Sequence, residues 1–142
     1  MARPLAALAL AALATPCAAA GVVGNGSPAS CTEAALDAAL AGGGTVTFHC
    51  GGPVVIPVSA AKTLTTTTTV DGTGQQITLD GGGTTRVFQT TYQFASFTIT
   101  LRNLTLRNGR AADFGGAVRL VYQDHPTTLD VEGVRFENNV AA

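Results

Sequence analysis

Apolar and polar residues alternate through residues 97–109, and the same pattern returns at residues 127–139. When the two stretches are aligned, their apolar positions coincide: Ile99 with Leu129, Leu101 with Val131, Leu104 with Val134 and Leu106 with Phe136. Alternation with a period of two is typical of a strand with one buried face. The pattern therefore predicts strands whose apolar faces stack on one another, and residues 77–81 match residues 99–103 as a weaker copy.

In each copy the alternation shifts at one small residue, which is Gly81, Asn103 or Gly133. Glycine and asparagine enter the left-handed backbone region at the least cost. The unit is thus a strand, a one-residue corner and a second strand. Because one such unit cannot bury its own apolar face, its repetition predicts a solenoid of about three rungs.

A helix is expected at 30–41, ahead of the first strand. Ser30 and Glu33 have the spacing of a capping box, and Leu36 and Leu40 lie one turn apart on the same face. A helix this short must be docked to be stable. We expect it to cover the exposed strand edges at the first end of the coil.

Further short strands are expected along the chain. Val54–Ile56 is confined to an edge or a corner by its flanking prolines. The threonine run 65–69 favours a plain strand over an ice-binding face or a glycosylated stalk. The other expected strands are Thr45–His49, Lys62–Val70, Arg86–Phe88 and 117–122.

The composition fits a strand-and-turn protein. The 142 residues include 17 glycines and no tryptophan, and only 12% are charged. A net charge of −1, spread along the chain, argues against a nucleic-acid partner. The chain has room for one domain, expected at 30–142 after a flexible lead at 21–29.

Residues 1–20 have the features of a secretory signal peptide. Arg3 supplies the positive start, 5–14 is apolar and 18–20 offers an A-x-A cleavage site. Cleavage after Ala14 and a buried alanine-rich helix are the alternatives. The apolar run is too short to cross a bilayer, so we expect a mature chain without a transmembrane helix, secreted or located at the cell envelope or outer membrane.

If the signal is removed, Cys31 and Cys50 remain. A pair of cysteines in an oxidising compartment predicts a disulfide, with two buried thiols as the alternative. His49 and His125 lack the ligand spacing of a metal site. No metal or other cofactor is indicated.

Two short motifs carry a resemblance to a known family. Gly115, Gly116, Ala117 and Val118, with Phe136, Asn138 and Asn139, resemble the GGA(I/L/V) and FxxN motifs of polymorphic outer membrane protein repeats. Those repeats belong to the pectin-lyase-like proteins. The resemblance implies an all-β fold, a right-handed single-stranded parallel β-helix, with the cap at its start. By motif it covers about residues 97–142, and the first copy departs from FxxN at Leu106–Gly109.

Each motif residue also has a structural role. Two glycines allow a sharp turn into the strand that begins at Ala117. Phe136 is expected to point inward and stack on Leu106. Asn108 and Asn138 are expected to form an amide ladder at the turn.

The acidic residues are mostly separated, and no catalytic motif occurs. Asp130 and Glu132 lie on one outward face near Arg102, which favours ordinary surface pairing over acid–base chemistry. We therefore expect an exported, non-catalytic, adhesin-like or passenger-like module that binds a surface glycan or a host or neighbouring cell. Its binding surface would be an outward strand face or the turn 110–114, and its open C-terminal rung is expected to continue into further repeats. The alternative is a pectin-lyase-like polysaccharide lyase or hydrolase whose catalytic rungs are absent or lie beyond residue 142.

Overall fold

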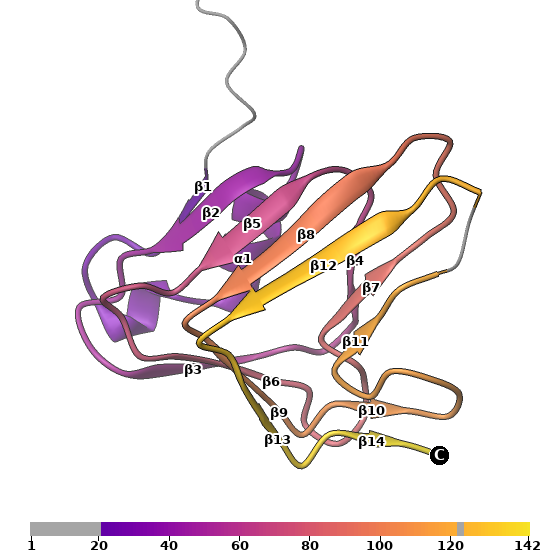
Figure 1. Cartoon of the computed structure of the whole chain (residues 1–142). Helices are drawn as coiled ribbons and strands as arrows, with labels where there is room; N and C mark the ends of the chain where they lie inside the picture. The colour runs from indigo at the N-terminus through magenta and orange to yellow at the C-terminus, as the bar shows by residue number, and fades with distance from the viewer. Residues whose placement is uncertain (1–20, 122–123) are drawn as a thin grey trace, which may run out of the picture.

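The computed structural model describes residues 21–121 and 124–142, which form an all-β solenoid of about four turns with parallel sheets (Figure 1). Besides the 3-10 helix η1 (Pro28–Ser30) and helix α1 (Glu33–Leu40), every regular element is a short strand. The strands are β1 (Gly21–Val23), β2 (Gly44–Phe48), β3 (Val54–Pro57), β4 (Lys62–Leu64), β5 (Thr68–Asp71), β6 (Ile77–Asp80), β7 (Phe88–Thr90), β8 (Phe97–Arg102), β9 (Thr105–Arg107), β10 (Arg110–Ala111), β11 (Val118–Arg119), β12 (Thr127–Glu132), β13 (Arg135–Glu137) and β14 (Val140–Ala141).

Successive turns of the coil place one strand in each of several parallel sheets. The sheet orders are β1-β2-β5-β8-β12, β3-β6-β9-β13, β4-β7-β11 and β10-β14. Four strands from β2 to β12 in the first sheet correspond to about four turns, one more than the sequence predicted. A coil in which each strand lies on its equivalent one turn earlier is the arrangement expected of a solenoid.

The core is a set of apolar columns along the coil axis. Val46 pairs with Val70, and Val70 pairs with Leu101. All three side chains are fully buried. Each such side chain contributes about 2 kcal/mol through burial. The next residue of the column, Val131, is 45% exposed, and β12 is the last strand of its sheet among the described residues.

The repeat at 97–109 and 127–139 is present in the structure. Leu101 lies beside Val131 and Leu106 beside Phe136, in parallel register. The corner residues Asn103 and Gly133 have φ values of 51° and 61°. Alternation and the left-handed corner therefore do set this part of the fold.

The weaker copy at 77–81 was aligned wrongly. β6 pairs with β9, so that Leu79 lies beside Leu106, whereas Leu101 receives Val70 of β5. Gly81 is not among the glycines with positive φ; Gly82 and Gly83 are, at 62° and 71°. Gly81 is required for a close approach instead, because a Cβ there would lie 2.3 Å from the carbonyl oxygen of Thr85.

Helix α1 is capped by Thr32, not by a capping box at Ser30. The Thr32 side chain accepts a hydrogen bond of 3.1 Å from the backbone N–H of Ala35. Ser30 belongs to η1, and Glu33 turns away to pair with Lys62. The expected flexible lead at 21–29 contains β1, which pairs with β2, and buries Val23 completely.

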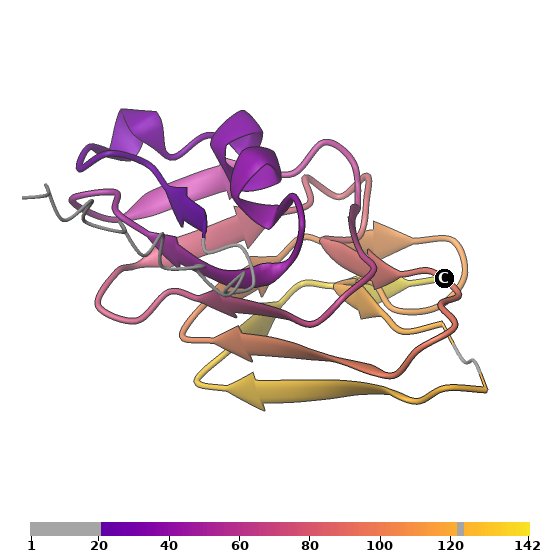
Figure 2. The same ribbon diagram turned by 90° about the horizontal axis from the view of Figure 1, so that it is seen from above.

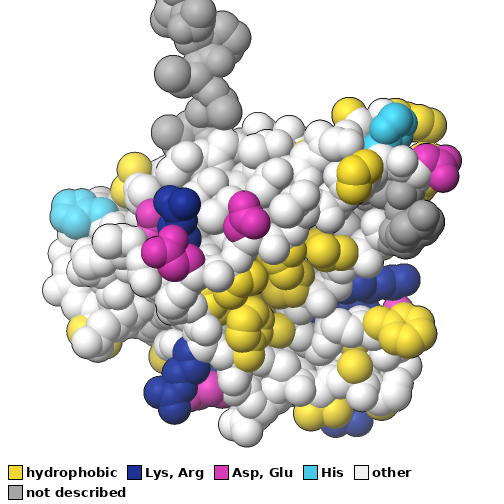
Figure 3. Space-filling view, in the orientation of Figure 1, with side chains coloured by type: hydrophobic (Ala, Val, Ile, Leu, Met, Phe, Trp, Pro, Cys, Tyr) yellow, Lys and Arg dark blue, Asp and Glu magenta, His cyan; other side chains and the backbone are white. Residues whose placement is uncertain are grey.

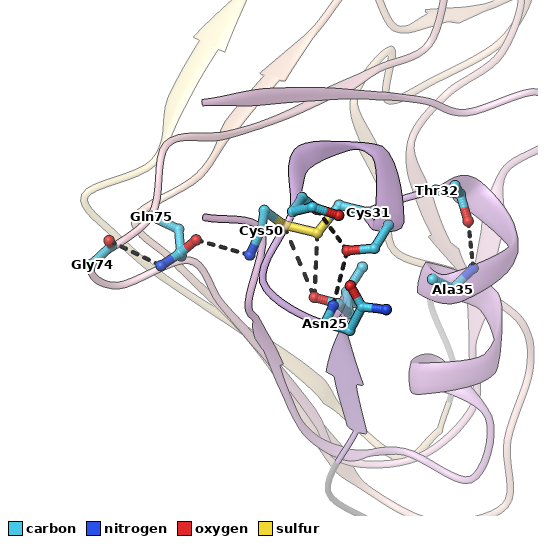
Figure 4. Close-up of a disulfide and its surroundings, with 10 residues drawn as sticks. Asn25, Cys31, Thr32, Ala35, Cys50, Gly74 and Gln75 are labelled. Atoms are coloured by element: carbon cyan, nitrogen blue, oxygen red, sulfur yellow. Dashed lines mark hydrogen bonds between the residues drawn. A yellow bond between two sulfur atoms is a disulfide. The ribbon is translucent and has the colours of Figure 1, made fainter. Parts of the chain in front are cut away.

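Helix α1 covers the first end of the coil, as Figure 2 shows, and its own side chains Leu36 and Ala39 are buried. A disulfide joins Cys31, just before the helix, to Cys50, just after β2 (Figure 4). On the other side Lys62, which is 8% exposed, contacts Glu33 at 2.6 Å and Asp37 at 2.7 Å. A covalent bond and an ion-pair cluster thus fix the cap.

Several expected strands have different bounds. Lys62–Val70 is divided into β4 and β5 by a corner at 65–67. Val54–Ile56 lies in β3 at the edge of its sheet, as the prolines indicated. Of the expected strand 117–122, β11 forms only Val118–Arg119, and Tyr122 lies outside the described residues.

The asparagine ladder is built differently from the prediction. Asn108 donates to both carboxylate oxygens of Asp80, at 3.1 and 3.2 Å. It is Asn139 that bonds the turn below, accepting from the N–H of Gly109 at 2.8 Å and donating to the carbonyl of Leu106 at 2.9 Å. Asn108 and Asn138 each form a left-handed corner, with φ values of 52° and 51°.

Gly115 and Gly116 lie where the chain must turn closely. Gly115 has a φ of 69°, and a Cβ on Gly116 would lie 2.6 Å from the carbonyl oxygen of Val140.

The predicted signal peptide, 1–20, lies outside the described residues. Within the described ranges, no helix combines the length and the apolar character needed to cross a membrane.

Candidate binding groove

A groove of about 480 Å³ runs across the corner between the sheet of β5, β8 and β12 and the sheet of β6, β9 and β13. Its lining combines the corner residues of three turns with the outward face of the second sheet. The lining residues are Gln75, Gln76, Ile77, Thr78, Asn103, Leu104, Thr105, Gly133 and Arg135. We call this feature the corner groove.

Register explains how the groove is built. Thr78, Thr105 and Arg135 occupy adjacent positions on three successive strands, one above the other on the outward face. Ile77 and Leu104, which also line the groove, are buried. The result is a row of polar side chains along the coil axis, one from each of three successive strands.

Hydrogen bonds fix the corner end of the groove. The amide of Asn103 donates to the hydroxyl of Thr73 at 2.6 Å. Gln75 accepts from the N–H of Cys50 at 3.1 Å, which ties the corner to the disulfide (Figure 4). Amides, hydroxyls and one guanidinium line the groove, and no lining residue is a carboxylate.

The carboxylates nearby are held in ion-pair columns. Arg102 lies in register between Asp71 and Glu132, and its Nε is 3.4 Å from Glu132 Oε2. The Thr73 hydroxyl, its backbone N–H and the charge of Arg102 together hold the pKa of Asp71 below its usual value. The pair expected from sequence, Arg102 with Glu132, is present and is a surface contact.

A second column repeats this arrangement. Arg107 lies in register between Asp80 and Glu137, with its Nε 2.7 Å from Asp80 Oδ2, whereas Glu137 forms its ion pair with Arg135 of the same strand. Burial alone would raise the pKa of Asp80, but Arg107, the N–H of Gly82 and the Asn108 amide lower it overall. Asp80 is therefore ionised and fully engaged, which is unsuited to a general base.

The turn 110–114, the other surface expected from sequence, contains a third ionic cluster. Asp113 pairs with both Arg86 and Arg119, and these two arginines lower its pKa although burial opposes them. Beside it Phe114 is 77% exposed. The cluster has two cations for one carboxylate.

Among the described residues, no group of three or more histidine, cysteine, aspartate and glutamate side chains could hold a metal ion. His49 lies beside Gly26, and His125 is exposed in the loop before β12. The two cysteines are joined to each other.

The corner groove was not among the sequence predictions. Its residues come from separate turns, and only the register between β6, β9 and β13 brings them together. The alternation of Thr78 and Thr105 with buried neighbours was the available signal, since it marks them as outward.

No protein-family model, curated protein or solved structure significantly matches the chain.

Proposed function

We propose that the protein is an exported, non-catalytic β-helix module, adhesin-like or passenger-like, that binds a surface glycan in the corner groove. The single observation that carries this proposal is the groove itself. A volume of about 480 Å³ lies within the range of small-ligand sites. Its amides and hydroxyls match the hydrogen-bonding groups of sugars.

The charge of the groove narrows the ligand class. Arg135 is the one charged residue that lines it. Its Nε contacts Glu137, and the other N–H groups of its exposed guanidinium are placed to pair with a ligand carboxylate. An acidic saccharide is therefore favoured over a neutral one. The nearby carboxylates support binding rather than catalysis, because Asp80 and Glu132 are each paired with an arginine and Asp71 accepts hydrogen bonds from Thr73.

Export is supported by the sequence features of residues 1–20 and by the disulfide. The GGAV and FENN motifs support a place among right-handed pectin-lyase-like β-helices with polymorphic outer membrane protein repeats. Both motifs lie at tight turns of the solenoid, where such repeats need glycine and asparagine.

Binding of acidic and neutral oligosaccharides to the purified protein tests the proposal. Replacing Arg135 with alanine should weaken binding of an acidic oligosaccharide about 10- to 100-fold, because a charge-assisted hydrogen bond contributes roughly 1.5–3 kcal/mol. Thr78→Ala should also weaken binding. Thr47→Ala is the matched control, because Thr47 is an exposed threonine of β2 outside the groove.

Equal binding by the Thr78→Ala and Thr47→Ala variants would contradict a ligand in the corner groove. Cleavage of polygalacturonate, measured with and without Ca²⁺, would contradict the non-catalytic assignment and support the lyase or hydrolase alternative.

A further inference from the structure

Exposed aromatic side chains lie at both ends of the strand pair β7 and β11, which are parallel neighbours. Phe94 is 84% exposed in the loop after β7, and its ring meets that of Tyr92 edge-on, with the centroids 5.5 Å apart. The Tyr92 hydroxyl donates to Asp124 at 3.3 Å, so a carboxylate lies at this end. Phe114 is 77% exposed at the other end, in the turn before β11. Figure 3 shows hydrophobic side chains projecting at the right of the molecule, where these strands lie in Figure 1.

Two arginines lie beside this strand pair. Arg119 of β11 is in register with Gln89 of β7, and the Gln89 side-chain oxygen accepts a hydrogen bond of 3.2 Å from Arg86. The Gln89 amide donates to the hydroxyl of Thr63 on β4 at 3.0 Å, which holds Gln89 in place. The arginines are thus fixed next to the exposed rings. We call Arg86, Arg119, Phe94 and Phe114 the aromatic–arginine face.

The two arginines share one carboxylate. Asp113 Oδ1 pairs with Arg86, and Asp113 Oδ2 lies 2.8 Å from Nη1 of Arg119. In the other ion pairs of the described residues, carboxylates equal or outnumber cations. Two positive charges and one negative charge leave this cluster with a net charge of +1, next to Phe114.

The missing negative charge matters most at Arg86, because its side chain is only 11% exposed. Lys62, at 8% exposed, is similarly buried and has two carboxylate partners of its own. A cation withdrawn from water needs compensating charge or hydrogen bonds. Arg119 has five N–H donors, and those not used by Asp113 remain for a second carboxylate. A carboxylate brought by a partner would therefore be stabilised here.

We infer that the aromatic–arginine face docks an acidic segment of another protein, with a carboxylate against the two arginines and apolar side chains against Phe114. Aromatic residues and arginine are enriched at protein–protein interfaces, and lysine and acidic residues are depleted. A ring as exposed as that of Phe114 projects from the surface, so it fits a partner's pocket and favours a protein over a glycan. None of the four residues of this face lines the corner groove, so it is a second binding surface, independent of the proposed glycan binding.

Selection from a random peptide library displayed on phage tests this inference. The protein should enrich peptides in which aspartate or glutamate lies next to apolar residues. A selected peptide should bind the Arg119→Ala variant at least about tenfold more weakly in fluorescence anisotropy, because a charge-assisted hydrogen bond is lost. Phe114→Ala should also weaken binding. Both side chains are partly or fully exposed, so the circular dichroism spectrum should stay unchanged.

Arg102→Ala is the matched control, because Arg102 is an exposed arginine on a different sheet with a carboxylate partner of its own. Changing the acidic residues of the selected peptide to their amides should weaken binding by a similar factor. Equal binding by the Arg119→Ala and Arg102→Ala variants would overturn the inference, as would a selection that yields no peptides or peptides without acidic residues. Displacement of the peptide by an acidic oligosaccharide in the Arg135→Ala variant would assign this face to a glycan instead.

Discussion

Single corner residues decide where each turn of the coil bends. Asn103 has a φ of 51°, and its amide donates to Thr73 one turn earlier. Gly133 occupies the same position one turn later, and a Cβ there would lie 2.4 Å from the Asn103 Oδ1 atom. Asparagine suits the corner at 103 because its side chain bonds Thr73 in the turn before. Glycine is needed at 133 because the Asn103 side chain leaves no room for a Cβ there.

Replacing Asn103 with valine should destabilise the protein more than replacing it with glycine. A β-branched residue at positive φ costs about 1–3 kcal/mol, whereas glycine removes that strain and loses one hydrogen bond worth about 1 kcal/mol. Urea unfolding at constant pH measures both values. Equal destabilisation by the two substitutions would contradict the strained corner.

At the scale of elements, the capping helix is held to the coil by charge. Burial alone would raise the pKa of Glu33, but hydrogen bonds from Lys62 and from the backbone and hydroxyl of Ser59 lower it to about 2, from 4.5. Burial alone would lower the pKa of Lys62, and its two carboxylate partners, Asp37 and Glu33, raise it overall. These contacts join α1 to β4 and to the loop that precedes it.

The stability supplied by Glu33 should depend on pH. Because its folded pKa is lowered, its contribution is complete above about pH 4.5 and is lost as the pH falls toward 2. We expect a loss of about 1–3 kcal/mol over this range. Glu33→Gln should remove this part of the pH dependence in urea unfolding measured at several pH values. An unchanged pH profile in that variant would show that Glu33 is not the group responsible.

The disulfide holds the same helix at its first turn, where Cys31 precedes Thr32. Cys31 and Cys50 are separated by 19 residues, and closing a loop of that length stabilises a protein by about 3 kcal/mol. Mild reduction, or replacement of both cysteines with serine, should lower the free energy of unfolding by about that amount. Thiol titration before and after denaturation identifies the oxidised state. Free thiols at Cys31 and Cys50 in the purified protein would contradict the bond.

At the scale of the whole molecule, stability should vary along the coil axis. Inner strands such as β5 and β8 have neighbours on both edges and pack above and below, whereas β13 has one neighbouring strand among the described residues. In a solenoid each turn is stabilised by the turns next to it. The last turn should therefore open more easily than the inner ones.

Hydrogen exchange should show this gradient. Amides of β8 should be protected most, and those of β13 least, at low protein concentration. Uniform protection along the chain would contradict a coil with one uncovered end.

The amino-acid sequence by itself determined the repeat. Alternation and left-handed corners are local properties, so Leu101 beside Val131, Leu106 beside Phe136 and the bend at Asn103 could be predicted from residue types alone. The cysteine pair and the short helix also followed from local signals.

The corners between strands differ in length along the chain. Only the tertiary structure decided which strands stack on one another at those corners. Between β5 and β6 the chain makes a longer turn than between β8 and β9, and this shifts Leu79 onto Leu106 instead of Leu101. The tertiary structure also pairs Glu33 with Lys62 rather than placing it in a capping box, and it leaves Phe136 half-exposed on the last strand of its sheet. The physical reason is that burial and register along the axis depend on the turn above and the turn below. Those neighbours are distant in sequence, and alternation within one strand carries no information about them.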